Sequence, residues 1–471
     1  MNYFVGVDLG TTAVKVVLFD ENGSAVKEAS RELSLVYPAT GWAEQDPAAW
    51  YEIPCELIRT VCETVPADEV AGISVSSQGI SVVPTDAAFR PLRSGISWLD
   101  GRAGEELAYL TSVIGPERLF ETTGKHPSPL YTLPKLIWLR RHERELFDRA
   151  DRFLMPMDYF TARTCGAPMT DATMAGGTML YDLRTLSWSR EIGDTFGIPL
   201  SKLPEVAPTA TLAGRINAET QERTGLGPHV SVAVGAQDQK IAAYGAGMRD
   251  GVATMSLGTA GAMEIPSRGK SKALPSFAFR VGDDTCYVLE GCINTFGAAI
   301  KWARDNVFTG MSYREMDRLA ETAAPGSGGV CFYPHLSGPS TPHFDRPPSS
   351  GWRDLSLSTT KADLIRSLYE GLACEVRMNL EAAERSGVTV RELTIFGGGS
   401  KSGIICRILA DMTGKTVRAL AFTEIAAYGA AKAAAVCCGC RSFAAQTAFQ
   451  EYQPESRTEE LYRHYGRGQM I

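Results

Sequence analysis

Two short turns, one in each half of the 471-residue chain, combine glycine with hydroxyl side chains. The first reads Asp8-Leu9-Gly10-Thr11-Thr12 and the second reads Ser256-Leu257-Gly258-Thr259. Glycine lets a ligand approach the backbone closely, and backbone N–H groups and threonine hydroxyls bind phosphate oxygens. A lone turn of this kind is read as an ordinary hairpin. Because the two turns occur at similar places in the two halves, they predict two similar domains that bind one anionic ligand.

Asp8 precedes the first turn directly, whereas Ser256 stands at the matching position of the second. A carboxylate next to a bound phosphate is repelled unless a cation lies between the two groups. Magnesium is a hard cation that prefers oxygen ligands of this kind. Asp8 is therefore predicted as a Mg²⁺ ligand at the phosphate end of the site. The alternative is an aspartate that only caps the turn.

A second carboxylate, Asp238, follows the apolar strand pattern of residues 230–234 and stands among small residues. A carboxylate at the end of a buried strand is placed where it can lie on the wall of a cleft. The alternative for Asp238, considered alone, is a helix N-cap. The sequence thus offers two carboxylates, each close to the end of a strand.

The triplet Gly397-Gly398-Gly399 predicts a third place where a ligand approaches the backbone, here a flat purine or a ribose. Three consecutive glycines weaken any fold, which favours a functional reason for them. Ser402 follows and is suited to begin a helix. Gly414-Lys415-Thr416 resembles the end of a P-loop, but Leu409 stands where that motif requires glycine, so no P-loop is predicted.

Alternating strand and helix patterns surround these residues and indicate an α/β chain. Strand patterns cover residues 4–8, 13–19, 25–33, 70–75, 80–83, 230–234, 252–255 and 393–396. Helical patterns cover residues 48–64, 133–147, 241–247, 361–386, 402–412 and 424–438, the last rich in alanine and suited to close packing. The boundary between two domains is predicted near residues 240–250.

Composition excludes several classes of protein. A chain of 471 residues suggests two or three domains, and 44% hydrophobic and 21% charged residues are ordinary globular values. A net charge of −7 argues against a nucleic-acid-binding surface. No signal pattern and no apolar run long enough for a membrane span are found. The odd number of scattered cysteines, 11, indicates reduced thiols and a cytoplasmic protein, with Cys437, Cys438 and Cys440 interpreted as packing residues.

With these residues in this order, the chain resembles the FGGY carbohydrate kinases, a branch of the actin and sugar-kinase superfamily. The resemblance is greatest to the xylulokinase-like members and extends over essentially the whole chain. The motifs that carry it are residues 6–11, 42–47, 98–102, 134–138, 237–239, 256–261, 336–343, 397–399 and 424–432. Each motif is short, but their common order makes chance agreement improbable.

The resemblance implies an α/β fold of two ribonuclease-H-like (actin-like ATPase) domains with a cleft between them. Residues 1–244 would form an N-terminal domain that binds mainly the sugar, and residues 245–471 a C-terminal domain that binds mainly the nucleotide. It also implies ATP and Mg²⁺ as cofactors, and transfer of the γ-phosphoryl group to a hydroxyl of a sugar or polyol. Nucleic acid and membrane are not expected as partners, and a homodimer is consistent with the family.

The same resemblance assigns roles to individual residues. Asp238 aligns with the family's catalytic base, which accepts the proton of the attacking hydroxyl, and Asp8 is the second catalytic carboxylate. Nucleotide contacts are implied at Thr11, Thr12, Gly258, Thr259, Gly297, Gly398, Gly399 and Ser402. Substrate contacts are implied at Gln78, Gly79, Trp98, Asp100, Arg102 and Gln239. The adenine side maps near Lys301 and Gly403, where glycerol kinases carry amides.

The substrate-side residues depart from the family pattern. Bacterial xylulokinases carry Gln-Met-His-Gly at residues 78–81 and Asn at Leu99, and glycerol kinases carry Arg-Glu at Gly79 and Ile80. Loss of the Met-His pair is expected to leave more room beside the sugar. A ketopentose such as xylulose is the preferred substrate, with gluconate, a tetritol, glycerol or a non-catalytic sugar- and ATP-responsive module as alternatives. Direct roles of His126, His335 and His343 stay open.

Overall fold

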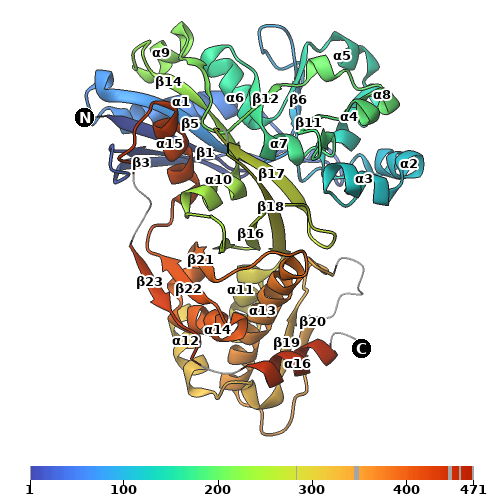
Figure 1. Ribbon diagram of the computed structural model, residues 1–471, viewed down its shortest axis with the longest axis vertical. Coiled ribbons are helices and arrows are strands. Elements are labelled where there is room, and N and C mark those ends of the chain that lie inside the picture. Colours follow the sequence, from blue (N-terminus) through green and yellow to red (C-terminus); the bar gives the residue numbers. More distant parts are fainter. Residues whose placement is uncertain (1, 283, 344–349, 444–447, 456–457, 469–471) are drawn as a thin grey trace. The chain divides into compact units, whose positions relative to one another are not determined.

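The computed structural model describes residues 2–282, 284–343, 350–443, 448–455 and 458–468 (Figure 1). The chain forms two compact units. The first contains residues 1–245, 276–288 and 424–445, and the second contains residues 246–275, 289–423 and 446–471. The division after residue 245 lies within the predicted boundary region. The prediction that residues 245–471 form one domain differs from this division at two segments. Residues 276–288 and 424–445 belong to the first unit.

The first unit is built on a six-stranded sheet of order β13-β14-β5-β1-β2-β3. The strands are β1 (Tyr3–Leu9), β2 (Ala13–Phe19), β3 (Ala25–Glu32), β5 (Val70–Ser77), β13 (Leu212–Arg215) and β14 (Ser231–Gln237). β5 is parallel to both β1 and β14, and the other pairs are antiparallel. β1, β5 and β14 are buried along nearly their whole length because both faces of the sheet are covered.

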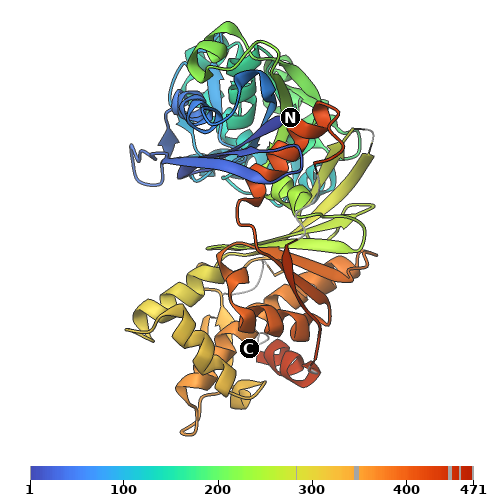
Figure 2. The ribbon, with the colours of Figure 1, turned by 90° about the vertical axis from the view of Figure 1, so that its left-hand side faces the viewer.

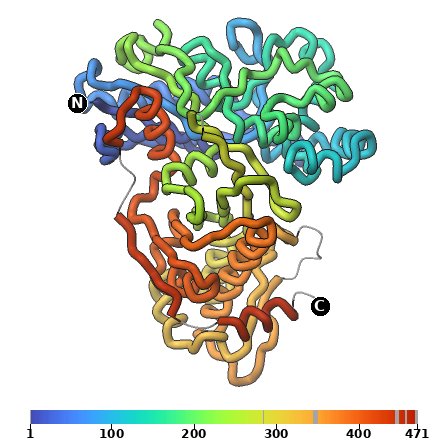
Figure 3. Tube along the Cα trace, in the orientation of Figure 1, coloured from blue at the N-terminus to red at the C-terminus, as the bar shows by residue number. Residues whose placement is uncertain are grey.

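Two helices cover opposite faces of this sheet. Val5 and Val7 of β1 belong to one core with residues of α1 (Ala49–Cys62). Gly6, between them, points the other way, and a Cβ added there would lie 1.8 Å from the carbonyl oxygen of Ala427. α15 (Ile425–Cys437) therefore approaches β1 through glycine and alanine, as its composition predicted. Figure 3 shows this late segment, in red, beside the first strands in blue.

The helical region that follows β5 has its own core. It contains α2 (Gly104–Ile114), α3 (Pro116–Thr123), α4 (Thr132–His142) and α5 (Arg144–Arg149). The single helix predicted over 133–147 is thus broken after His142. The strand predicted over 80–83 is confirmed only at its end: Ile80 has a φ of 61° in a bend, Val82 forms an isolated bridge with Ile96, and β6 (Val83–Thr85) begins at Val83. The apolar residues at 80–83 predict burial, but they do not predict the positive φ that Ile80 adopts directly after Gly79.

The second unit repeats the arrangement of a hairpin joined to a parallel strand. β15 (Val252–Leu257) is antiparallel to β16 (Gly261–Ser267) and parallel to β21 (Glu392–Phe396), as β1 is to β2 and β5. β22 (Thr416–Leu420) and β23 (Phe449–Tyr452) continue the sheet. Figure 2 shows the helices of this unit gathered below its strands, among them α11 (Phe296–Asn306), α13 (Lys361–Glu384) and α14 (Gly403–Thr413). The repeated topology confirms the expected two-domain α/β fold.

Among the described residues, no helix combines the length and the apolar composition needed to cross a membrane. The longest, α13, is buried in the core of the second unit and carries several charged residues.

Candidate active site

The parallel strands of the first unit end at the same level. Asp8 of β1 is in register with Ser76 of β5, and Gln237 of β14 is in register with Ser77. Asp238 is the next residue after Gln237 and begins α10 (Asp238–Gly245). Ligands of open α/β sheets bind outside the carboxyl ends of such strands. The structure therefore brings the two predicted carboxylates, Asp8 and Asp238, to one edge of one sheet.

The surroundings of Asp8 disfavour the ionised form of its carboxylate. The hydroxyl of Ser76 donates a hydrogen bond to Asp8 Oδ1 at 2.7 Å. Burial, and to a smaller extent the negative charge of Glu424, raise the pKa of Asp8 from 3.8 to about 6, against the lowering effects of the Ser76 hydrogen bond and of Lys15. Glu424 itself is paired with Lys15 Nζ at 2.6 Å. The Asp8 carboxylate supplies oxygen ligands of the kind that Mg²⁺ prefers, so this residue fits the predicted ion.

The first Gly-Thr turn is fixed from two sides. The indole N–H of Trp98 donates to Thr11 Oγ1 at 2.8 Å, and Gln45 Nε2 donates to the Thr11 carbonyl oxygen at 2.7 Å. Because an indole can only donate, the Thr11 hydroxyl accepts here and directs its own proton elsewhere. Thr12 is exposed at the tip of the turn. Trp98, predicted as a substrate contact, thus also positions a predicted phosphate contact.

Gln78 and Gly79 follow β5 at the same edge. Gln78 is buried, and its Nε2 donates to Gln45 Oε1 at 2.8 Å. A Cβ placed on Gly79 would lie 3.3 Å from Cγ of Gln237. The extra room expected from the loss of larger residues at this position is therefore taken by the Gln237 side chain. No local sequence pattern signals this contact, because it joins residues at the ends of two different strands.

Asp100 and Arg102, also predicted as substrate contacts, are fully buried and bonded to each other. Arg102 Nη2 lies 2.8 Å from Asp100 Oδ2 and 2.7 Å from Glu44 Oε1, and its guanidinium stacks 3.7 Å above the Trp42 ring. Lys135, which is also buried, donates to the Trp98 carbonyl oxygen at 3.4 Å. Burial lowers the pKa of Lys135 to about 7. These buried contacts hold in place the segment of residues 98–102, which contains Trp98.

Asp238 is held by its neighbours in sequence. Its Oδ1 accepts the backbone N–H of Gln239 at 2.7 Å and a hydrogen bond from Nε2 of Gln237. The residue is only partly buried. Gln239, predicted as a substrate contact, is likewise partly buried in the first turn of α10.

In the second unit the structure gathers four of the predicted nucleotide contacts around one turn. The N–H of Gly297 donates to the Gly258 carbonyl oxygen at 3.0 Å, and a Cβ on Gly297 would approach that oxygen to 2.4 Å. A Cβ on Gly399 would lie 2.9 Å from Cβ of Leu257. The start of α11 and the glycine triplet therefore both pack against the Gly258–Thr259 turn, which explains why glycine is required at these positions.

The remaining predicted positions in this unit have less specific surroundings. Apart from its chain neighbours, no atom of the residues that the structure describes lies within 4 Å of a Cβ built on Gly398, so this face of the triplet is open among them. Ser402 is the N-cap of α14, where its hydroxyl accepts the N–H of Ile405 at 3.4 Å. Lys301 pairs with Asp305 at 2.6 Å on the surface of α11, and Gly403 is the first residue of α14.

The histidines left open by the sequence have structural partners. His126 stacks on Phe120 at 4.5 Å, and burial lowers its pKa. His335 lies 3.4 Å from the buried Glu375 carboxylate. The backbone N–H of His343 donates to the Ser340 carbonyl oxygen at 2.9 Å.

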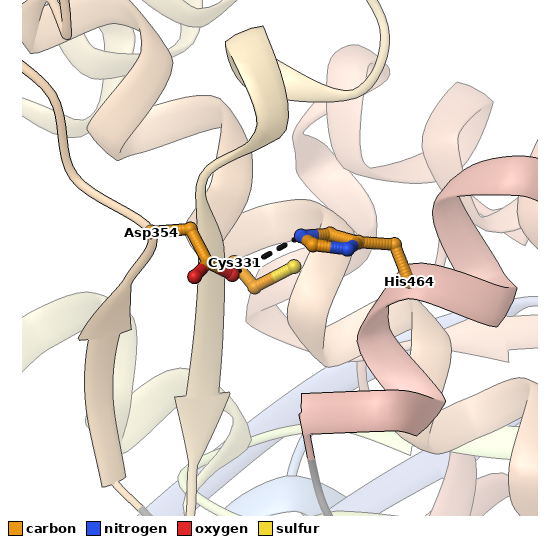
Figure 4. A group of neighbouring side chains, drawn as sticks. All are labelled: Cys331, Asp354 and His464. Atoms are coloured by element: carbon orange, nitrogen blue, oxygen red, sulfur yellow. Dashed lines mark ion pairs between the residues drawn. The ribbon is translucent and has the colours of Figure 1, made fainter.

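A separate group of metal-ligating side chains, Cys331, Asp354 and His464, lies in the second unit (Figure 4). His464 Nε2 is 3.1 Å from Asp354 Oδ2 and 3.1 Å from the Gly329 carbonyl oxygen. Burial raises the pKa of Cys331 to about 11, so it is a neutral thiol at physiological pH. The contacts of His464 with Asp354 and Gly329 connect α16 (Glu459–Gly468) to the segments that flank the hairpin of β19 (Cys331–Pro334) and β20 (Ser350–Arg353).

Comparisons with known proteins show which family the chain matches. The N-terminal-domain model of the FGGY family of carbohydrate kinases matches residues 3–245, and its C-terminal-domain model matches residues 253–438. A xylulose kinase of Lactococcus lactis is 30% identical over 93% of this chain and 88% of its own length. A glycerol kinase of Citrifermentans bemidjiense is 31% identical over 98% and 97%. A solved gluconate kinase from Lactobacillus acidophilus has a TM-score of 0.90 at 25% identity, covering 100% and 96%.

Proposed function

The chain belongs to the FGGY family of carbohydrate kinases, and on this basis we propose that it phosphorylates a ketopentose such as xylulose. The observation that carries the proposal is the position of Asp238. It follows the central parallel strands at the edge where Asp8 and the Thr11 turn also lie. A carboxylate there is suited to accept the proton of a sugar hydroxyl, and a chain that only binds ATP has no need of it.

The residues of the first unit divide the work of phosphoryl transfer. Asp238 would orient the attacking hydroxyl and accept its proton, while Thr11 and Thr12 donate hydrogen bonds to phosphate oxygens. Trp98, Gln78 and Gln239 would orient the sugar. When bound at Asp8, Mg²⁺ would neutralise part of the phosphate charge.

The second unit would hold the nucleotide. The Gly258–Thr259 turn offers backbone N–H groups and a hydroxyl to phosphate oxygens. Gly297 and Gly399 keep the backbone around this turn close-packed, and the open face of Gly398 leaves space for a flat group. ATP binding is therefore expected to depend on these glycines and on Thr259, and sugar binding on the first unit.

The sugar itself is proposed from the relatives. The similarity to xylulose kinases, such as that of L. lactis, favours a ketopentose as the substrate of this chain. The similarity to a glycerol kinase over nearly the whole chain makes a smaller polyol the second candidate. Gluconate and tetritols stay in the test set because Gly79, Ile80 and Leu99 differ from the xylulokinase pattern. A non-catalytic module would consume no ATP with any of them.

The test is a panel of ketopentoses, tetritols, glycerol and gluconate with coupled detection of ADP. We expect ADP release that depends on both sugar and Mg²⁺, fastest with xylulose. The Asp238→Asn variant should lose several orders of magnitude in kcat while its affinity for ATP is kept, because the base acts in the transition state. Near-normal kcat in this variant would remove Asp238 as the base, and faster turnover of glycerol or gluconate would replace xylulose as the substrate.

A further inference from the structure

Gln237 is the last residue of β14 and stands directly before Asp238. Its Nε2–H donates to Asp238 Oδ1, which also accepts the backbone N–H of Gln239 at 2.7 Å. One oxygen of the carboxylate is thus committed to two donors. Neither the family resemblance nor the predicted contacts gave Gln237 a role.

The backbone of Gln237 is itself anchored. Its N–H donates to Thr173 Oγ1 at 2.9 Å, and the Thr173 hydroxyl donates to Asp171 Oδ1 at 2.9 Å. Asp171 is buried and also accepts the backbone N–H groups of Thr173 and Met174, both at 3.0 Å. Because the only hydroxyl proton of Thr173 is directed to Asp171, its lone pair is directed to Gln237. Two hydrogen bonds therefore connect a buried carboxylate to the residue that precedes Asp238.

The side chain of Gln237 is positioned by packing. A Cβ on Gly79 would lie 3.3 Å from its Cγ and 3.7 Å from its Nε2, so the carboxamide rests on the face where Gly79 has no side chain. The first of these distances is tighter than an ordinary van der Waals contact. A larger residue at position 79 would push the amide away from Asp238.

We propose that Gln237 is a positioning residue for the catalytic base, with Gly79 providing the space that this role requires. The inference rests on the proposed function, in which Asp238 accepts the substrate's proton. Oδ1 is the oxygen that accepts the hydrogen bonds from Gln237 and Gln239. In the reaction the hydroxyl O–H bond breaks toward the Asp238 carboxylate, the O–P bond to the γ-phosphorus forms, and the bond from that phosphorus to ADP breaks.

A hydrogen bond donated to a carboxylate favours its ionised form, so Gln237 should also lower the pKa of Asp238. Gln237→Met removes the donor and keeps the length of the side chain. We expect kcat to fall roughly 100-fold, as is typical when a reacting group is misplaced, while KM for ATP and the thermal midpoint change little. Gln221→Met is the matched control, since Gln221 lies in α9 (Ala218–Thr224), away from the site, and its Nε2 donates to the Ile216 carbonyl oxygen.

A measurement without substrate separates this inference from the proposed function. In protein labelled with ¹³C at aspartate carboxyls, the Asp238 signal is identified by its loss in Asp238→Asn. Its pKa should be higher in Gln237→Met than in the parent protein and unchanged in Gln221→Met. An unchanged pKa would overturn the positioning role, even if the parent enzyme is an active kinase. A raised pKa in a protein that phosphorylates no sugar would keep the effect of Gln237 on the Asp238 carboxylate, but would reject the proposed function and with it the role of Asp238 as a base.

Gly79→Ala tests the packing step. It should reduce kcat in the parent protein because the new methyl group displaces Gln237. In the Gln237→Met background, where no amide donor remains, the same change should add little. Equal losses in the two backgrounds would show that Gly79 acts independently of Gln237 and would overturn that part of the proposal.

Discussion

Replacing Asp8 by Asn should make the protein more stable and inactive at once. The Asp8 carboxylate is desolvated at the end of β1 and lies near Glu424, so its ionised form is disfavoured in the folded state. Asn keeps an oxygen that can accept the 2.7 Å hydrogen bond from Ser76 but carries no charge. Mg²⁺-dependent turnover should be lost because the proposed metal ligand is gone.

The size of the stability effect follows from the pKa of Asp8. A rise from 3.8 to about 6 means that ionising Asp8 costs at most about 3 kcal/mol of folding free energy. Because the folded pKa is the higher one, the penalty is absent below about pH 3.8, grows as the pH rises to about 6, and is constant above that. The gain from Asp8→Asn should therefore be about 3 kcal/mol at pH 8 and about 1 kcal/mol at pH 4.5.

Urea unfolding followed by tryptophan fluorescence, in buffers with EDTA, measures this difference at the two pH values. Most of the tryptophans belong to the first unit, so the signal reports mainly on the part that contains Asp8. Asp68→Asn, on an exposed turn of the same unit, is the control and should change stability little at either pH. An equal gain at pH 4.5 and pH 8, or no gain at all, would refute the argument from desolvation.

Two further predictions concern the division of work between the units. Lys135→Met removes the donor to the Trp98 and Leu130 carbonyl oxygens. KM for the sugar should therefore rise several-fold, with KM for ATP unchanged. Initial rates with each substrate varied in turn measure both constants, and an unchanged KM for the sugar would contradict the prediction. Gly297→Ala places a methyl group 2.4 Å from the Gly258 carbonyl oxygen. The affinity for ATP, measured by calorimetry, should fall at least tenfold, which corresponds to a loss of roughly 1.4 kcal/mol of binding free energy. Retained affinity would show that this turn is not part of the nucleotide site.

Much of the fold was predictable because its signals are local. The strands around both Gly-Thr turns, the helix at 361–384 and the N-cap at Ser402 depend on residues within a few positions of one another. The error at Ile80 shows the limit of such signals. An apolar run predicts burial, but the turn that follows Gly79 is imposed by the need to leave the sheet.

The candidate site was predictable only as a set of separate segments. The sequence by itself determined that Asp8 and Asp238 each lie near the end of a strand, since a short run of residues specifies this. Only the tertiary structure placed Glu424 beside Asp8, and Gln237 against Gly79, because these contacts join segments distant in sequence. Strand register and helix packing decide which side chains meet across such distances, and no local pattern encodes them.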